Sequence, residues 1–151
     1  MQAELKFKHL DKKLTDSEIL KVAQVLGFDF PEPLYCHFLA HNGGFPVACV
    51  FQDPFLDTIV SETLPLISNS GRGTAVTAYQ ILVGEKKIVP PHLLPFAVDA
   101  GGDYFFCDLL TIDAQLYFFR SEYYPDNEKC LCELGMPLDD FFNNLVIDDA
   151  L

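Results

Sequence analysis

An α+β domain with a largely antiparallel, twisted sheet of about six strands is the fold class that this sequence predicts. Two observations lead to it. Short aromatic and β-branched runs, each closed by turn residues, fill the stretch from Leu94 to Glu122 and predict consecutive strands. Helix signals lie in the N-terminal, middle and C-terminal parts of the chain. With 151 residues we expect a single domain over residues 1–151, with its core at about 15–146.

Three strands are expected in the central stretch. The first, Leu94 to Val98, is entered through Pro95 and ends at the turn Asp99-Ala100-Gly101-Gly102-Asp103, whose glycines can adopt positive φ. The second strand runs from Tyr104 to Leu110 and the third from Gln115 to Ser121. Each of them is short enough for the interior of a small sheet.

The pairing of the second and third strands depends on the length of their connection. If Ile112-Asp113 is a two-residue connection, Cys107 lies opposite Phe118 and Leu109 lies opposite Leu116. Neither face of this pair is polar. We therefore expect central strands with at least one face under helices.

The two N-terminal helices have clear local signals. Thr15-Asp16-Ser17-Glu18 is a capping box that opens the first helix, and Gly27 ends it. Pro31 and Pro33 fit the first turn of the second helix, which Asn42-Gly43-Gly44 stops with a left-handed residue.

The remaining elements are predicted from apolar spacing and turn residues. Further helices are expected from Thr74 to Val83 and after Pro137, with Leu138, Phe141, Phe142 and Leu145 on one stripe of the last helix. Additional strands are expected at Val47–Gln52 and Lys129–Leu134.

The formal net charge is −12, and the acidity increases toward the C-terminus. Residues 121–151 hold eight acidic residues and one basic residue. Such a field disfavours nucleic acid and anionic membranes and attracts basic partners. Ordinary solubility explains the same charge equally simply.

Targeting and redox signals point to the cytoplasm. The start MQAELKFKHLDKK has no apolar core of a secretory signal, and no run approaches a membrane span. The five cysteines form no CxxC pair and suit reduced thiols.

Motifs for chemistry are weak. No phosphate-binding loop, nucleophile elbow or HExxH motif is present, so we expect no cofactor and no catalytic residues. His37 and His41 are four residues apart on a predicted helix, but without a third ligand we do not predict a metal site. Asp99 and Asp103 flank a tight turn and could form a paired-carboxylate site. The competing interpretation is that both accept backbone N–H groups of that turn.

Several motifs together carry a family resemblance. These are Pro33-Leu34-Tyr35-Cys36-His37-Phe38-Leu39 with Asn42-Gly43-Gly44, then the run from Leu93 to Phe105, then Leu116-Tyr117-Phe118-Phe119 and Leu138-Asp139-Asp140-Phe141-Phe142. In this order they resemble the SUKH superfamily, which includes a fungal cell-wall synthesis regulator and many bacterial immunity proteins. The resemblance covers about residues 15–146. One departure is Asp103, where members often carry Asn.

The resemblance implies a non-catalytic α+β domain that neutralises a cognate toxin, often a nuclease, by direct contact. The matching residues Asn42, Gly43, Gly44, Pro95, Asp99, Gly101, Gly102 and Tyr104 are expected to maintain the fold. Two alternatives are a regulatory scaffold like the fungal relative, and a small-molecule-binding or hydrolytic domain that uses Asp99 and Asp103.

An acidic protein can occlude the basic groove of a nuclease. We therefore predict that the partner is basic and that it binds the acidic C-terminal third of the chain. The candidate partner-binding residues are Glu122, Asp126, Glu128, Glu133, Asp139 and Asp140. Solvation is the competing explanation for these acids.

Overall fold

The computed structural model of the chain describes residues 6–54 and 56–148, the side chains of residues 127 and 128 excepted. The elements in chain order are β1 (Phe7–Lys8), α1 (Asp16–Leu26), α2 (Glu32–Ala40), β2 (Phe45–Pro46), β3 (Val50–Asp53), β4 (Leu56–Thr63), α3 (Ala75–Tyr79), the π-helical segment η1 (Gln80–Glu85), β5 (Leu93–Asp99), β6 (Tyr104–Asp108), β7 (Gln115–Phe119), the 3₁₀ turn η2 (Ser121–Tyr123), α4 (Asn127–Cys130), β8 (Leu131–Pro137) and α5 (Leu138–Asn143).

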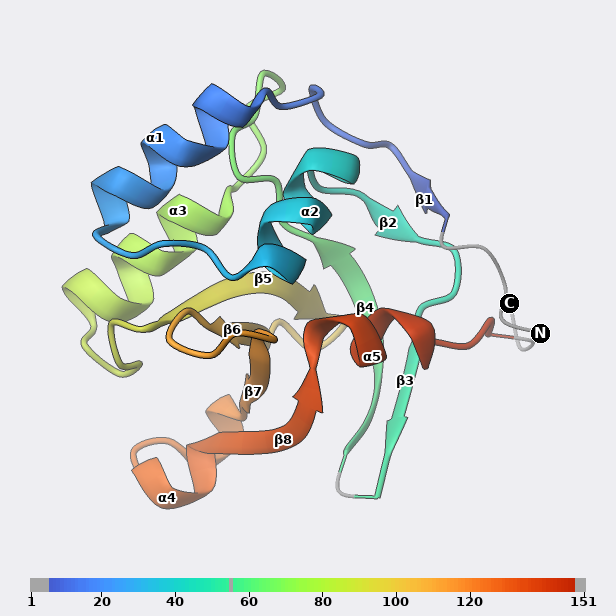
Figure 1. The fold of residues 1–151 in the computed structure, drawn as a ribbon. Helices are drawn as coiled ribbons and strands as arrows, with labels where there is room; N and C mark the ends of the chain where they lie inside the picture. The colour runs from blue at the N-terminus through green and yellow to red at the C-terminus, as the bar shows by residue number, and fades with distance from the viewer. Residues whose placement is uncertain (1–5, 55, 149–151) are drawn as a thin grey trace.

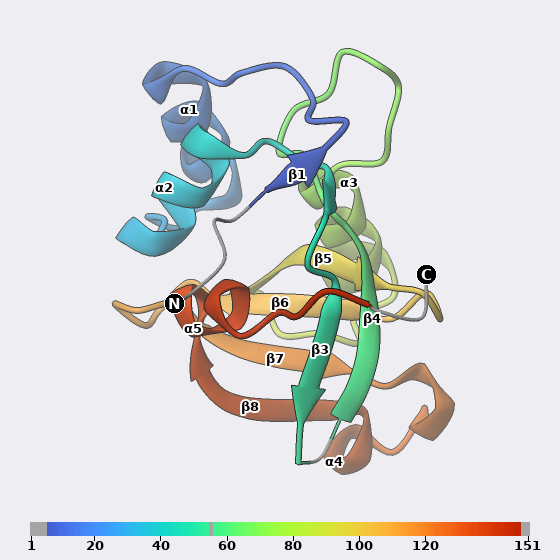
Figure 2. The same ribbon diagram turned by 90° about the vertical axis from the view of Figure 1, so that its right-hand side faces the viewer.

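The main sheet has six strands in the order β3-β4-β5-β6-β7-β8, and each neighbouring pair is antiparallel. β1 and β2 form a separate two-stranded sheet. In Figures 1 and 2, α1 and α2 lie above the main sheet and α4 lies at its opposite end. The predicted α+β class with a largely antiparallel sheet is thus confirmed.

The first helix begins and ends as its sequence predicts. The Thr15 hydroxyl accepts from the Glu18 N–H at 3.2 Å, and the Glu18 carboxylate accepts from the Thr15 N–H at 3.0 Å. Gly27 ends α1 in the left-handed region with φ of 84°. The capping box thus satisfies two N–H groups at the start of α1, and the Gly27 N–H donates to the carbonyls of Ala23 and Gln24 at its end.

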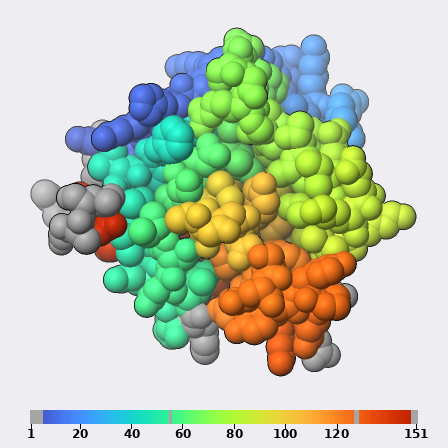
Figure 3. Space-filling model, turned by 180° about the vertical axis from the view of Figure 1, so that it is seen from behind, coloured from blue at the N-terminus to red at the C-terminus, as the bar shows by residue number. Residues whose placement is uncertain are grey.

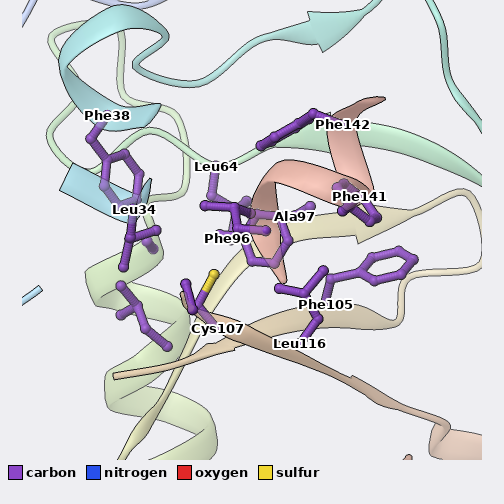
Figure 4. Close-up of a cluster of buried hydrophobic side chains, with 14 of the residues drawn as sticks. Leu34, Phe38, Leu64, Phe96, Ala97, Phe105, Cys107, Leu116, Phe141 and Phe142 are labelled. Atoms are coloured by element: carbon purple, nitrogen blue, oxygen red, sulfur yellow. The ribbon is translucent and has the colours of Figure 1, made fainter. Parts of the chain in front are cut away.

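One face of the sheet carries the main core (Figure 4). Phe96 of β5 and Phe105 of β6 are fully buried there, and Phe141 of α5 packs on both rings with centroid separations of 5.4 and 5.0 Å. Phe105 also pairs across the ladder with Phe118 of β7. The helix after Pro137 is therefore held by its aromatic stripe, as its spacing predicts.

The other face of the sheet carries a second, smaller apolar cluster. Phe106 and Phe119 point to this side, where they meet Leu82 of η1 and Val89 of the following loop. Because consecutive strand residues point to opposite faces, the two apolar faces expected for the central strands are both present.

The predicted register of the second and third central strands is wrong by two residues. Phe105, and not Cys107, lies opposite Phe118, while Cys107 lies opposite Leu116. The connection is longer than two residues because it includes the turn after Asp108, and Ala114 closes it with a φ of 55°. A shift by two leaves every side chain on its predicted face, so the core survives the error.

Other boundaries also differ from prediction. The strand expected at Val47–Gln52 begins only at Val50 and runs to Asp53, and the short strand β2 that precedes it pairs with β1. The strand expected at Lys129–Leu134 begins at Leu131, since α4 takes the residues before it. The helix expected from Thr74 to Val83 continues as the π-helical segment η1.

The Asn42-Gly43-Gly44 segment does not stop α2 with a left-handed residue as predicted, because α2 ends at Ala40 and its C-cap residue His41 is extended, with φ of −141°. The segment instead connects distant parts of the chain. The buried Asn42 amide donates to the carbonyls of Lys12 and Ile67, both at 2.8 Å, and its oxygen accepts from the Leu66 N–H at 2.7 Å. It therefore joins the chain before α1 to the chain after β4. Gly43 packs directly against Pro65.

Candidate interaction surfaces

The acidic candidate residues follow the last edge of the sheet. Glu122 lies in η2, Asp126 lies just before α4, and Glu133 lies in β8; all three are exposed. Asp139 and Asp140 are exposed in the first turn of α5. Glu128 falls outside the residues whose side chains are described.

These acids form a band and not a compact patch. β8 is a seven-residue strand with α4 at one end and α5 at the other (Figure 1), so it separates the two ends of the band by roughly 20 Å. At the opposite edge of the sheet, the chain after α5 pairs with the start of β3, through two backbone hydrogen bonds between Val50 and Val146. The acidic band therefore accompanies the edge strand that ends the sheet order. Charge on an edge strand also discourages pairing with other chains, which gives the band a second, purely protective explanation.

The turn carboxylates are engaged by the fold. Asp99 Oδ1 accepts from the N–H groups of Gly101 and Asp103 at 3.0 and 2.8 Å, and Oδ2 accepts from the Thr58 hydroxyl at 2.8 Å. Asp103 Oδ1 accepts from the Ser121 N–H at 3.4 Å. Asp99 therefore accepts N–H groups of its own turn, as one interpretation of the sequence expects. That interpretation is wrong for Asp103, whose carboxylate accepts from Ser121, outside the turn.

The remaining motif residues lie in this turn or in the two strands that it joins. Gly102 has φ of 90°, a conformation that favours glycine, whereas Gly101 needs no such freedom. Pro95 lies at the irregularity between β5 and β6, and Tyr104 pairs with Val98 at the start of β6. Gly102 therefore shapes the turn itself, whereas Pro95 and Tyr104 belong to the paired strands.

The histidine pair is packed among aromatic rings. His37 stacks on Phe142 with a centroid separation of 4.8 Å, and its ring lies 6.2 Å from that of His41. Among residues 6–54 and 56–148, no three His, Cys, Asp or Glu side chains come together as metal ligands. Burial, followed by the neighbouring His41, lowers the pKa of His37 to about 3. His37 is therefore a neutral core residue.

The neutral state of His37 gives a pH dependence. Because the unfolded pKa is 6.5 and the folded pKa is about 3, the unfolded chain binds the extra proton between these values. The free energy of unfolding therefore has its full value, as far as His37 is concerned, above pH 6.5. Below that pH it falls by about 1.4 kcal/mol per pH unit until the folded pKa of His37 is reached. Burial of His41 lowers its pKa in the same direction. Burial raises the pKa of Asp11, but the hydrogen bonds that its carboxylate accepts from Ser68 and its neighbours lower it to about 2, which matters only below the ordinary value of 3.8.

We expect His37→Phe to flatten the fall in unfolding free energy between pH 6.5 and 4.5, measured by urea denaturation at several pH values. His37→Leu provides a second non-titrating variant, without an aromatic ring, in case the larger ring of phenylalanine disturbs the packing. Equal slopes in the wild type and in both variants would contradict the assignment of this titration to His37.

A groove lies on the back of the sheet, over the second apolar cluster. One hollow of about 570 Å³ lies between η1, the loop before β5 and the start of β8, and it has Ile88, Phe119 and Leu131 in its wall. A second hollow of about 460 Å³ shares Ile88 and Phe119 and ends at Tyr124. We call the two hollows together the back-face groove. It is mainly apolar, but Lys87 lines the first hollow and Lys86 the second.

The sequence alone does not indicate this groove. Glu85-Lys86-Lys87 has the pattern of a solvated loop, and Phe119 has the pattern of an ordinary core strand residue. No local pattern in the sequence indicates that the loop after η1 covers only part of the back face of the sheet. The sequence feature that points to the groove is the pair of adjacent lysines, Lys86 and Lys87, in an otherwise acidic part of the chain.

The fold and these surfaces define a small α+β domain that presents an acidic edge and a separate apolar groove. A model of the SMI1 / KNR4 family (SUKH-1) matches residues 13–144, so the chain belongs to this family. The resemblance seen in the motifs is thereby confirmed. No curated protein and no solved structure matches the chain. Within the described part of the chain, no helix has the length and apolar character needed to cross a bilayer.

Proposed function

We propose that this chain is a non-catalytic binding protein of the immunity type, which neutralises a basic protein toxin by covering the toxin's substrate-binding surface. The observation that carries the proposal is the exposed acidic band along β8 and α5, in a region with a single basic residue, Lys129, among residues 121–151. Carboxylates spaced along the edge of the sheet can pair with basic groups of a toxin that would otherwise contact nucleic-acid phosphates. The engagement of Asp99 by its own turn supports a fold role for that residue over acid-base chemistry.

The test is co-expression with the toxin domain encoded beside the gene of this chain. We expect the two proteins to purify as one complex and cell growth to be restored. A neighbouring toxin domain that forms no complex would contradict the proposal. Complexes with several cellular proteins, in a genome without a neighbouring toxin gene, would favour the regulatory scaffold instead.

Charge reversal tests the acidic band itself. We expect the double variant Glu122→Lys/Glu133→Lys to bind the toxin domain at least about tenfold more weakly, mainly through slower association, as measured by stopped-flow fluorescence. Asp139 and Asp140 are left unchanged because they stabilise the first turn of α5.

The matched control is Asp29→Lys/Asp57→Lys, which changes the net charge equally at exposed positions away from the band. If the control weakens binding as much as the test variant, the interaction depends on total charge and not on this surface.

A further inference from the structure

The back-face groove has the composition of a protein-docking site. Its floor is apolar and aromatic, formed by Phe119 and Ile88, and the half-exposed Tyr124 stands at its end with 57% exposure. Aromatic side chains at the rim and floor of a groove are typical of residues that contribute most of the binding energy at interfaces. On the face shown in Figure 3, the lime surface of α3 and η1 adjoins the orange surface of the β7–α4 region.

The groove has the opposite charge to the rest of the molecule. Lys86 and Lys87 are exposed at its mouth, and neither forms an ion pair with another residue that the structure describes. Only four basic residues occur in residues 31–120, against nine acidic ones. Glu85, the nearest acid in the sequence, lines neither hollow.

The two lysines are carried by an anchored segment. The Lys86 N–H donates to the Ile81 carbonyl at 2.8 Å, and the Ile88 N–H donates to the Leu82 carbonyl at 3.0 Å. The backbone that presents the positive charges is therefore fixed relative to the apolar floor. A fixed arrangement reduces the entropy lost when a partner binds.

We propose that the back-face groove binds an acidic polypeptide segment of a partner protein, with apolar side chains in the two hollows and carboxylates on Lys86 and Lys87. The hollows share Ile88 and Phe119, so they run into each other and suit an extended segment with side chains on one face. A second copy of this chain is disfavoured because two molecules of net charge −12 repel each other. This second surface has the opposite polarity to the acidic band, which it meets at η2, where Ser121 and Tyr124 line the second hollow on either side of Glu122.

The probe is a phage-displayed library of short random peptides, selected on the full chain. We expect the enriched peptides to combine Leu, Ile or Phe with Asp or Glu. Their synthetic forms should bind Lys86→Glu/Lys87→Glu at least tenfold more weakly by fluorescence anisotropy. Binding should be unchanged in Lys13→Glu/Lys21→Glu, which alters the net charge equally at exposed positions near and in α1. Ile88→Asp should also weaken binding, since it places a charge on the apolar floor.

The remaining outcomes each overturn the proposal. Enrichment of basic peptides, unaffected by the Lys86/Lys87 variant, would assign peptide binding to the acidic band alone. Absence of enrichment, together with lysine-dependent binding of dodecanoate, would make the groove a small-ligand site. A dimer in sedimentation that dissociates in the Lys86/Lys87 variant would make it a self-association surface.

Discussion

Asn42→Ala is expected to lower the free energy of unfolding by about 3 kcal/mol or more. The buried Asn42 side chain satisfies three backbone groups, namely the carbonyls of Lys12 and Ile67 and the N–H of Leu66. Truncation leaves all three buried without this partner, and each unsatisfied group costs about 1 to 3 kcal/mol. Chemical denaturation of the variant and the wild type measures the difference.

Two further substitutions test whether the loss comes from these three hydrogen bonds and not from a general effect of replacing an asparagine. Asn42→Asp keeps the shape but removes the donors, so a carboxylate would face two carbonyl oxygens, and we expect a loss at least as large as that of Asn42→Ala. Asn69→Ala serves as the control because Asn69 is exposed and its bond to Asp11 uses only the backbone N–H. Equal stability of Asn42→Asp and the wild type would contradict the stabilising role of the Asn42 hydrogen bonds.

Gly43→Ala is the second substitution with a large expected effect, about 3 kcal/mol of destabilisation or more. Gly43 has φ of 71°, a conformation that costs a residue with a side chain about 1 to 2 kcal/mol. A Cβ atom there would also lie 2.7 Å from the backbone nitrogen of Pro65 and 2.8 Å from its Cβ. Either the chain at Pro65 or the end of α2 must therefore move.

Gly71→Ala isolates the steric part of this effect. Gly71 has a similar φ of 77°, but an added Cβ would meet no atom within 4 Å. We expect only about 1 kcal/mol of destabilisation, from the conformational cost less the entropy that alanine removes from the unfolded chain. Similar losses in the two alanine variants, measured by thermal and urea unfolding, would show that contact with Pro65 is unimportant.

Local signals in the sequence predicted the parts of the fold that depend on neighbouring residues. The capping box at Thr15 and the left-handed Gly27 are made within one turn of the same helix, so their sequence specifies them. The apolar stripe of the last helix and the two apolar faces of the central strands were also predicted, because burial follows residue spacing.

Features set by distant partners were not predictable. The role of Asn42 depends on carbonyls of residues 12 and 67, which are 30 and 25 positions away in the chain. The register error arose because the sequence favours a short turn at Ile112-Asp113, whereas the chain adopts a positive φ at Ala114. The pairing of β1 with β2 joins segments that are far apart in the sequence and have weak strand signals of their own.

The two candidate surfaces also differ in how far the sequence could predict them. Exposure of Glu133, Asp139 and Asp140 follows from their place in the patterns of a strand and a helix, so their position on the surface could be expected. Their arrangement as a band along the sheet edge required the topology. The back-face groove required knowledge of how much of the sheet the loop after η1 leaves uncovered.

The proposed function requires the protein to act on a basic partner through shape and negative potential. Its most direct test is the association rate constant between the chain and the toxin domain encoded beside its gene, measured as a function of ionic strength. We predict fast association that slows steeply as salt is added, while dissociation changes little. An association rate that stays constant across the same range of salt would contradict the claim.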